Sequence, residues 1–162
     1  MSEQLPADRK SPNGSGVIVD TSATDVRAPL PRAAVRSLVR FVLRRSRVRS
    51  AVVSVAFVSN RRIAALNRRV FGRSGVTDVI ALTFRKAAEA APAVGDVYVA
   101  ADVVRANARR ARIGVREEAA RVVVHGVLHV LGHDHPDTDR EKSAMWRAQE
   151  RHLLAAKREG VW

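Results

Sequence analysis

Apolar residues along the chain form two patterns, continuous runs and runs at helical spacing. Residues 51–58 (AVVSVAFV) form a nearly continuous apolar run rich in β-branched side chains, which predicts a buried strand. Shorter apolar runs predict strands at 17–19, 79–84 and 97–100, and an Ala/Pro-rich segment at 87–94 separates the last two. We therefore expect a sheet of four strands.

Apolar residues three or four positions apart predict five helices between and after these strands. Proline, cap-forming residues and acidic first turns indicate where the helices begin: at Pro31, at Ser59 or Asn60, at Asp102, near Val115 and at about Asp139. The second helix should stop near Gly72 and the last near Ala156.

The segment 122–131 fits both kinds of element. Three consecutive valines at 122–124 suit a strand, whereas the spacing of the histidines that follow favours a helix. With a helix there, the order of elements predicts an α+β fold, a small four-stranded mixed sheet packed with about five helices. No repeat divides the chain, so we expect a disordered tail at 1–15 and a single domain at 16–162.

The charge of the chain points to a polyanion. There are 29 Lys and Arg against 16 Asp and Glu, a formal net charge of +13, and nearly all the basic residues are arginines. Arginine offers planar, forked donors that match phosphate, which favours a nucleic-acid partner, although a genome rich in Arg and Ala codons would also explain the count. The exposed side of the first helix is basic, with Arg36, Arg40, Arg44 and Arg45. The few aromatic residues argue against a base-stacking platform.

Two absences narrow the possible functions. The chain has no cysteine, so disulfide scaffolds, thiolate zinc sites and cysteine nucleophiles are excluded, and any metal must be held by His, Asp or Glu. There is no signal-like apolar run at the start and no stretch near the ~20 apolar residues of a membrane span. We expect a cytoplasmic protein without a membrane partner.

Four of the five histidines fall within one stretch, HGVLHVLGHDH at 125–135. On a helix, His125 and His129 point the same way and can share a metal ion. A third ligand eight residues on would lie ~12 Å along the axis, so the helix must end first, and Gly132 suits a left-handed cap. The chain can then bring back His135, which we favour as the third ligand over its rival His133.

Three protein ligands with an open fourth position are the arrangement of a catalytic zinc. We therefore predict one zinc ion, held by His125, His129 and His135, whose bound water is activated for hydrolysis. The spacing matches the metzincin protease pattern H-E-x-x-H-x-x-G-x-x-H. Gly126 replaces the glutamate that serves as general base there, which puts peptide cleavage in doubt.

The histidine stretch also resembles the signature of the YbeY family of bacterial rRNA maturation factors, H-G-x-L-H-L-x-G-x-D-H. Further segments over residues 17–156 are similar to this family in order and spacing: Leu66-Asn67, Thr77-Asp78-Val79-Ile80, Gly95-Asp96-Val97-Tyr98-Val99, Met145, Glu150 and Leu153-Leu154. The resemblance implies a zinc-dependent endoribonuclease directed at single-stranded RNA, which acts in ribosomal RNA maturation and small-subunit quality control. It also implies a zinc site at one end of a positively lined groove, with ribosomal RNA and the small ribosomal subunit or its proteins as partners.

The loop after Asn67 departs from the family pattern. The family commonly has Y-R-G-K-D-x-P-T-D there, and its arginine, which the resemblance associates with activity, falls on Phe71. Arg69 or Arg73 can supply a guanidinium from a neighbouring position; we favour Arg73 as the catalytic group and expect both to contact RNA. Asp134 matches the motif, either as a partner that orients a ligating histidine or in a local Asx-turn.

Three functions from different classes follow. The first is metal-dependent cleavage of an RNA phosphodiester, with zinc-bound water attacking and arginines neutralising the phosphate charge. The second is a non-catalytic ribosome-assembly or RNA-binding factor with a structural zinc. The third is a metalloprotease-like hydrolase acting on a peptide or small molecule. Strong salt dependence of RNA binding would separate the first two from the third.

Overall fold

The four predicted strands form one mixed sheet, seen in a computed structural model that describes residues 16–85 and 91–162. The strands are β1 (Val17–Thr24), β2 (Ala51–Val58), β3 (Val79–Arg85) and β4 (Ala93–Ala100). Their order across the sheet is β1-β2-β4-β3. Strands β1, β2 and β4 are parallel, and β3 pairs with β4 in the antiparallel sense. The parallel register aligns Ala51 with Val17 on one side and Ala93 on the other.

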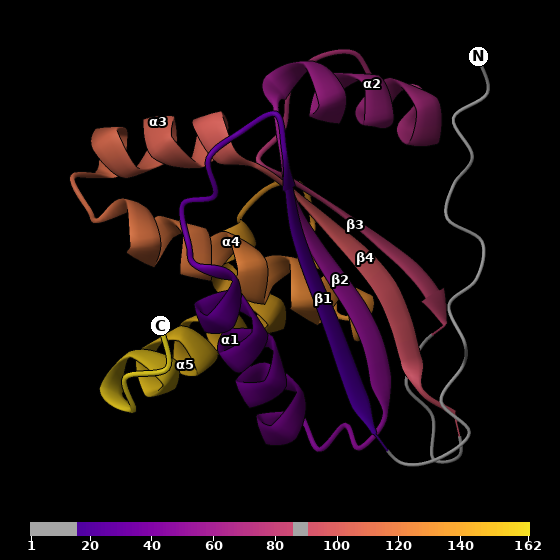
Figure 1. The fold of residues 1–162 in the computed structure, drawn as a ribbon, viewed down its shortest axis with the longest axis vertical. Helices are drawn as coiled ribbons and strands as arrows, with labels where there is room; N and C mark the ends of the chain where they lie inside the picture. Colours follow the sequence, from indigo (N-terminus) through magenta and orange to yellow (C-terminus); the bar gives the residue numbers. More distant parts are fainter. Residues whose placement is uncertain (1–15, 86–90) are drawn as a thin grey trace.

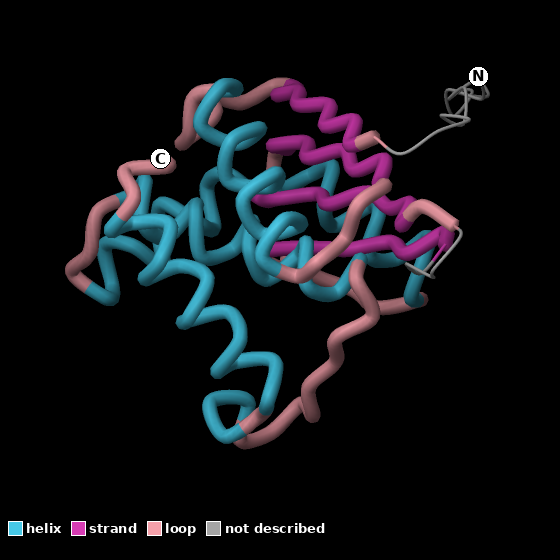
Figure 2. Tube along the Cα trace, turned by 90° about the horizontal axis from the view of Figure 1, so that it is seen from below, coloured by secondary structure: helices cyan, strands magenta, loops and turns pink. Residues whose placement is uncertain are grey.

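Five helices pack around this sheet, as the sequence pattern predicts. They are α1 (Arg32–Arg45), α2 (Asn60–Phe71), α3 (Ala101–Ala111), α4 (Val115–Val130) and α5 (Ala144–Arg158), with a short 3₁₀ turn, η1 (Arg140–Lys142), before α5. Figure 1 shows α1, α4 and α5 together on one side of the sheet, and Figure 2 shows the four strands as a layer with helices against it. The α+β prediction is confirmed.

The alternation of side chains along the strands builds two cores. Val53, Val55 and Phe57 of β2 face the main core, which α1, α4 and α5 complete. Val58 faces the other way and joins a smaller core under Ile63 of α2. Because successive side chains of a strand point to opposite faces, the nearly continuous apolar run of β2 is buried on both sides.

The central helix α4 lies against the sheet at two glycines. A Cβ atom on Gly126 would lie 2.4 Å from a methyl of Val97 on β4, and one on Gly95 would lie 2.6 Å from a methyl of Val130. The backbones of α4 and β4 therefore approach closely at two points, at Gly126 on the helix and at Gly95 on the strand. The neighbours of α4, which are α1, α3, α5 and the sheet, explain why most side chains of 122–130 are apolar and buried although the segment is helical.

Two predicted helix starts are wrong. Helix α3 begins at Ala101, not at a cap on Asp102, because β4 runs directly into it; Asp102 lies in the first turn and pairs with Arg105 at 3.0 Å. Helix α5 begins at Ala144 rather than near Asp139, since Asp139 has a left-handed φ of 55°. Its cap is Ser143, whose hydroxyl accepts the backbone N–H of Trp146 at 3.0 Å.

The fourth strand begins at Ala93 instead of 97, so part of the predicted 87–94 connection is strand. Its residues 87–90, and the tail predicted at 1–15, lie outside the described residues. Strand β1 extends five residues beyond its predicted end at 19 because its whole length pairs with β2. None of the helices in the described part of the chain has the length and apolar composition needed to cross a bilayer.

Candidate metal centre

The end of α4 carries the histidine cluster and then reverses the chain. His125 and His129 lie one helical turn apart, in the last two turns of α4. Gly132 follows with a φ of 91°. The backbone N–H of Gly132 donates to the carbonyl of His129 at 2.9 Å, and the backbone N–H of His133 donates to the carbonyl of Leu128 at 3.0 Å. This pair of hydrogen bonds is the Schellman motif that glycine favours at a helix end. After the turn, the chain returns His135 to the other two rings.

The three imidazoles converge through the same ring atom. The Nε2 of His125 lies 3.1 Å from the Nε2 of His129 and 3.3 Å from that of His135. One ligand atom from each of the three lies within 4.8 Å of the other two. Tetrahedral zinc with Zn–N bonds of about 2.0–2.1 Å places its ligand atoms about 3.3 Å apart, so the spacing fits such an ion.

The opposite nitrogen of each ring faces an oxygen acceptor of the protein. The Nδ1 contacts are His125 with the side-chain carbonyl of Gln149 at 2.7 Å, His129 with the backbone carbonyl of His133 at 3.0 Å, and His135 with the backbone carbonyl of Pro136 at 3.0 Å. Because a carbonyl only accepts, each Nδ1 carries the proton and each Nε2 presents a lone pair. Three lone pairs facing one point repel one another unless a cation lies between them, which is the property of a metal site.

Burial keeps the rings of His125 and His129 neutral. It lowers the pKa of His125, and the Gln149 contact opposes that effect only in part. Burial, together with the positive charges that His125 and His135 would carry, lowers the pKa of His129 to about 4. Near pH 7 both rings are therefore in the neutral form that binds metal.

Comparison with known proteins gives a family. The family described as "Endoribonuclease YbeY" matches residues 19–157 of the 162. The chain belongs to the YbeY family.

Curated relatives with the same name agree with this assignment. "Endoribonuclease YbeY" of Bacillus subtilis is 32% identical over 126 residues, covering 72% of this chain and 80% of that protein. The protein of that name from Syntrophus aciditrophicus is 29% identical over 123 residues, covering 74% and 77%. The one from Anaeromyxobacter is 39% identical over 85 residues, a match that spans 52% of this chain and 44% of that relative.

A solved structure has the same fold. The solution structure of TM1509 from Thermotoga maritima superposes with a TM-score of 0.63, covering 88% of this chain and 91% of that one. At 24% sequence identity, this likeness concerns the fold alone.

Gly126, the second residue of the YbeY-like motif, has a steric role in this chain. Besides the 2.4 Å approach to Val97, a Cβ atom there would lie 3.3 Å from a methyl of Val79 at the start of β3. A side chain at this position meets the sheet, so a metzincin-type glutamate has no room. The same contact places the start of β3 beside the histidine cluster.

The two residues before His135 in the chain, His133 and Asp134, make contacts near the cluster but do not belong to it. The side chain of His133 is exposed and outside the cluster, and only its backbone carbonyl contributes, to the ring of His129. Asp134 accepts the backbone N–H of His135 at 2.8 Å, which is a local contact. The ring N–H groups of His125, His129 and His135 bind other oxygens, so Asp134 is not the acceptor for any ring of the cluster.

The arginine loop of the YbeY-like pattern lies between α2 and β3. Helix α2 ends at Gly72, as predicted, and Gly72 has a left-handed backbone. The side-chain amide of Asn67 donates to the carbonyl of Gly75 at 3.2 Å. Arg69 and Arg73 are exposed, and Phe71 is 50% exposed at the position of the family's arginine. The loop leads to Asp78, whose negative charge acts on His125 and raises its pKa slightly against the effect of burial.

Sequence reasoning did not find Gln149, although it anchors the cluster. Gln149 is 1% exposed and joins His125 to a polar chain: its amide donates to Glu150 at 3.1 Å, and Glu150 accepts from Arg121 at 3.2 Å. The available signal was its place on the apolar face of α5, four residues after Met145 and four before Leu153. A polar residue at such a position is buried, and it needs a partner.

Proposed function

We propose that this YbeY-family protein is a zinc-dependent endoribonuclease that cleaves single-stranded RNA during ribosomal RNA maturation and small-subunit quality control. The observation that carries the proposal is the convergence of three histidine Nε2 atoms whose Nδ1 protons are all held by carbonyl oxygens. Membership of a family described as an endoribonuclease supplies the class of reaction.

The number of ligands favours a catalytic metal over a structural one. Among residues 16–85 and 91–162, the group of metal-binding side chains contains His125, His129 and His135 and no fourth member. A structural zinc site is closed by four protein ligands, whereas a catalytic site keeps one position for water or substrate. When bound, zinc would supply Lewis acidity and lower the pKa of a water molecule towards 7.

The chain's own residues would orient this site and hold the substrate. Gln149, buried behind His125, fixes the tautomer and the angle of that ring. Arg69 is exposed at the end of α2, and Arg73 is exposed in the loop that leads to β3. We assign to both the binding of phosphates, and to Arg73 the neutralisation of charge that develops on the cleaved phosphate. The net charge of +13 suits a polyanionic substrate.

The cellular setting follows from the substrate. We propose that the protein acts in the cytoplasm, with ribosomal RNA and the small ribosomal subunit or its proteins as partners. The name shared by the curated relatives and the basic surface support an RNA partner, and the lack of room for a glutamate at Gly126 argues against the peptidase alternative.

The test is RNA cleavage by purified, zinc-loaded protein. A 5′-labelled single-stranded RNA and the same RNA annealed to its complement are incubated with protein, with protein plus chelator, and with the His129→Ala variant. We expect internal cuts in the single strand only, lost with chelator, restored by added zinc and absent in His129→Ala. RNA that is bound but never cut under several metals would favour an assembly factor with a structural zinc.

A further inference from the structure

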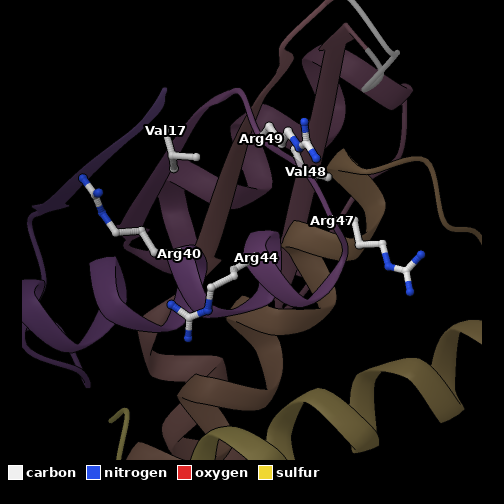
Figure 3. Close-up of a pocket in the computed structure, with 6 residues that line it drawn as sticks. All are labelled: Val17, Arg40, Arg44, Arg47, Val48 and Arg49. Atoms are coloured by element: carbon white, nitrogen blue, oxygen red, sulfur yellow. The ribbon is translucent and has the colours of Figure 1, made fainter. Parts of the chain in front are cut away.

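A second basic feature lies away from the histidine cluster, where α1 ends and the chain turns into β2. A hollow of about 790 Å³ is lined there by Arg40, Arg44, Arg47 and Arg49, with Val17 and Val48 as its apolar part (Figure 3). We call it the arginine hollow. Its four arginines come from one helix face and the following turn, and all are exposed.

These four arginines have no acidic partners in the described part of the chain. Ion pairs there involve other cations, such as Arg105, Arg121 and Lys157. Arg44 lies over the ring of buried Phe41, 5.5 Å from its centroid, which holds its guanidinium at the surface. Four unneutralised guanidinium groups around one hollow repel one another, and an anion removes that repulsion.

The arrangement of the side chains indicates the shape of that anion. Figure 3 shows the guanidinium groups of Arg40, Arg44 and Arg47 spread around the hollow instead of meeting at its centre. A single phosphate needs donors that converge on one point, whereas a strand with repeated charges can meet separated donors in succession. The apolar walls and planar guanidinium groups also offer surfaces for unpaired bases.

A histidine of α5 lies within electrostatic range of groups near both the hollow and the metal centre. His152 of α5 is half-buried, and its pKa is lowered by burial and then by the charges of Arg45, Arg151 and His133. Arg45 is the neighbour of Arg44 in the last turn of α1, and His133 lies two residues before His135. Arg45, beside the hollow, and His133, beside the histidine cluster, therefore both lie within electrostatic range of His152.

We propose that the arginine hollow is a subsite for the backbone phosphates of single-stranded RNA, which holds the strand at a distance from the histidine cluster. The choice of RNA over an acidic peptide rests on the proposed function, whereas the choice of an extended polyanion rests on the hollow itself.

The test compares two triple variants with equal loss of charge. Arg44→Gln/Arg47→Gln/Arg49→Gln removes three of the hollow's four cations and leaves Arg40. Arg109→Gln/Arg110→Gln/Arg112→Gln is the matched control. The control arginines are also exposed, at the end of α3, and Arg112 repeats the left-handed backbone of Arg47 after a helix. They precede α4, at the opposite end of that helix from His129 (Figure 1).

Binding is measured with the zinc-loaded full chain and a fluorescein-labelled 2′-O-methyl single-stranded oligonucleotide, checked as intact on a gel, over a series of salt concentrations. Since single strands give a slope of about −0.7 per phosphate contact in log K against log salt, losing three contacts should reduce the slope by about 2. We expect the hollow variant to bind at least about tenfold more weakly at 0.1 M salt, and the control to change by less than about twofold.

The outcomes separate this inference from the proposed function. Equal effects in the two variants, or no effect in either, would overturn the subsite, whether or not the protein cleaves RNA. If the hollow variant keeps its affinity for the oligonucleotide but loses affinity for poly-glutamate, the hollow belongs to an acidic protein partner and the RNA assignment is wrong. If the hollow variant alone loses affinity in a protein that never cuts RNA, the subsite stands and the proposed catalysis fails.

Discussion

Replacing Gln149 with methionine should weaken zinc binding without touching a ligand. The Gln149 carbonyl is the acceptor for the Nδ1 proton of His125 at 2.7 Å, and only 1% of the residue is exposed, so water has little access to replace it. Methionine has similar length and no acceptor of comparable strength. Without the acceptor, the His125 ring is free to place its proton on Nε2, the atom that faces the other two histidines.

The expected loss follows from known effects of such outer hydrogen bonds. Removing the partner of a metal-binding histidine costs about 10–100-fold in metal affinity. At about 1.4 kcal/mol per factor of ten, this corresponds to about 1.4–2.7 kcal/mol of binding free energy. In the metal-free protein, the buried N–H left without an acceptor should lower the free energy of unfolding by about 1–3 kcal/mol.

The assay is a zinc competition titration against a chromophoric chelator, with Leu153→Ala as the control. Leu153 lies one turn after Gln149 on the same buried face of α5, and its truncation costs about 2–5 kcal/mol of stability without removing a hydrogen bond to any histidine. We expect the zinc Kd to rise in Gln149→Met and to stay close to wild type in Leu153→Ala. An unchanged Kd in Gln149→Met, or an equal rise in both variants, would show that the Gln149 hydrogen bond does not support zinc binding.

Three further predictions concern the loop, the helix–sheet contact and pH. Arg73→Ala should slow single-turnover RNA cleavage at least about tenfold while changing RNA affinity less than about threefold, since its role is assigned to the transition state; an unchanged rate, with a slow Arg69→Ala, would move the role to Arg69. Gly126→Ala should lower the free energy of unfolding by about 1–3 kcal/mol, because the added Cβ would clash with the sheet. In the control Gly114→Ala, the added Cβ has no atom within 4 Å, so urea unfolding should show only a small effect. Burial and nearby positive charges lower the pKa of His152, and its Nδ1 is buried without a hydrogen-bond partner. As pH falls, the unfolded chain therefore takes up a proton on this ring near pH 6.5, whereas the folded chain takes it up only at lower pH. Its contribution is therefore present above about pH 6.5 and lost as pH falls towards the folded pKa; His152→Gln should reduce the stability loss between pH 7 and 5, and an identical pH profile would contradict this.

The order of elements followed from the sequence because each has a strong local pattern. Helix boundaries were harder where two cap-type residues compete: Asp139 and Ser143 both suit a helix start, and the left-handed backbone at Asp139 decides for Ser143. Helix α3 starts after Ala100 with no side-chain cap, so no sequence signal marks it. The first residues of β4 have poor strand propensity, and they are strand because β2 and β3 pair with them on both sides.

The part of the metal centre that depends on residues close together in the sequence could be predicted. Helical period brings His125 and His129 together, and Gly132 explains the return of His135, all within eleven residues. Gln149 reaches the site only because α5 packs on α4, a contact 24 residues away from His125 in sequence. The steric role of Gly126 also depends on the sheet, and sequence reasoning could see only the missing glutamate.

We propose that three particular histidines hold the metal that RNA cleavage requires. The most direct test of this proposal is to measure zinc per chain and single-stranded RNA cleavage together in wild type, His135→Ala and His133→Ala. The two variants remove histidines two residues apart, of which only His135 lies in the cluster. We predict one zinc and full cleavage in wild type and His133→Ala, and neither in His135→Ala. Retention of zinc and cleavage in His135→Ala would show that His135 is not a ligand, and their loss in His133→Ala would show that the third ligand is His133.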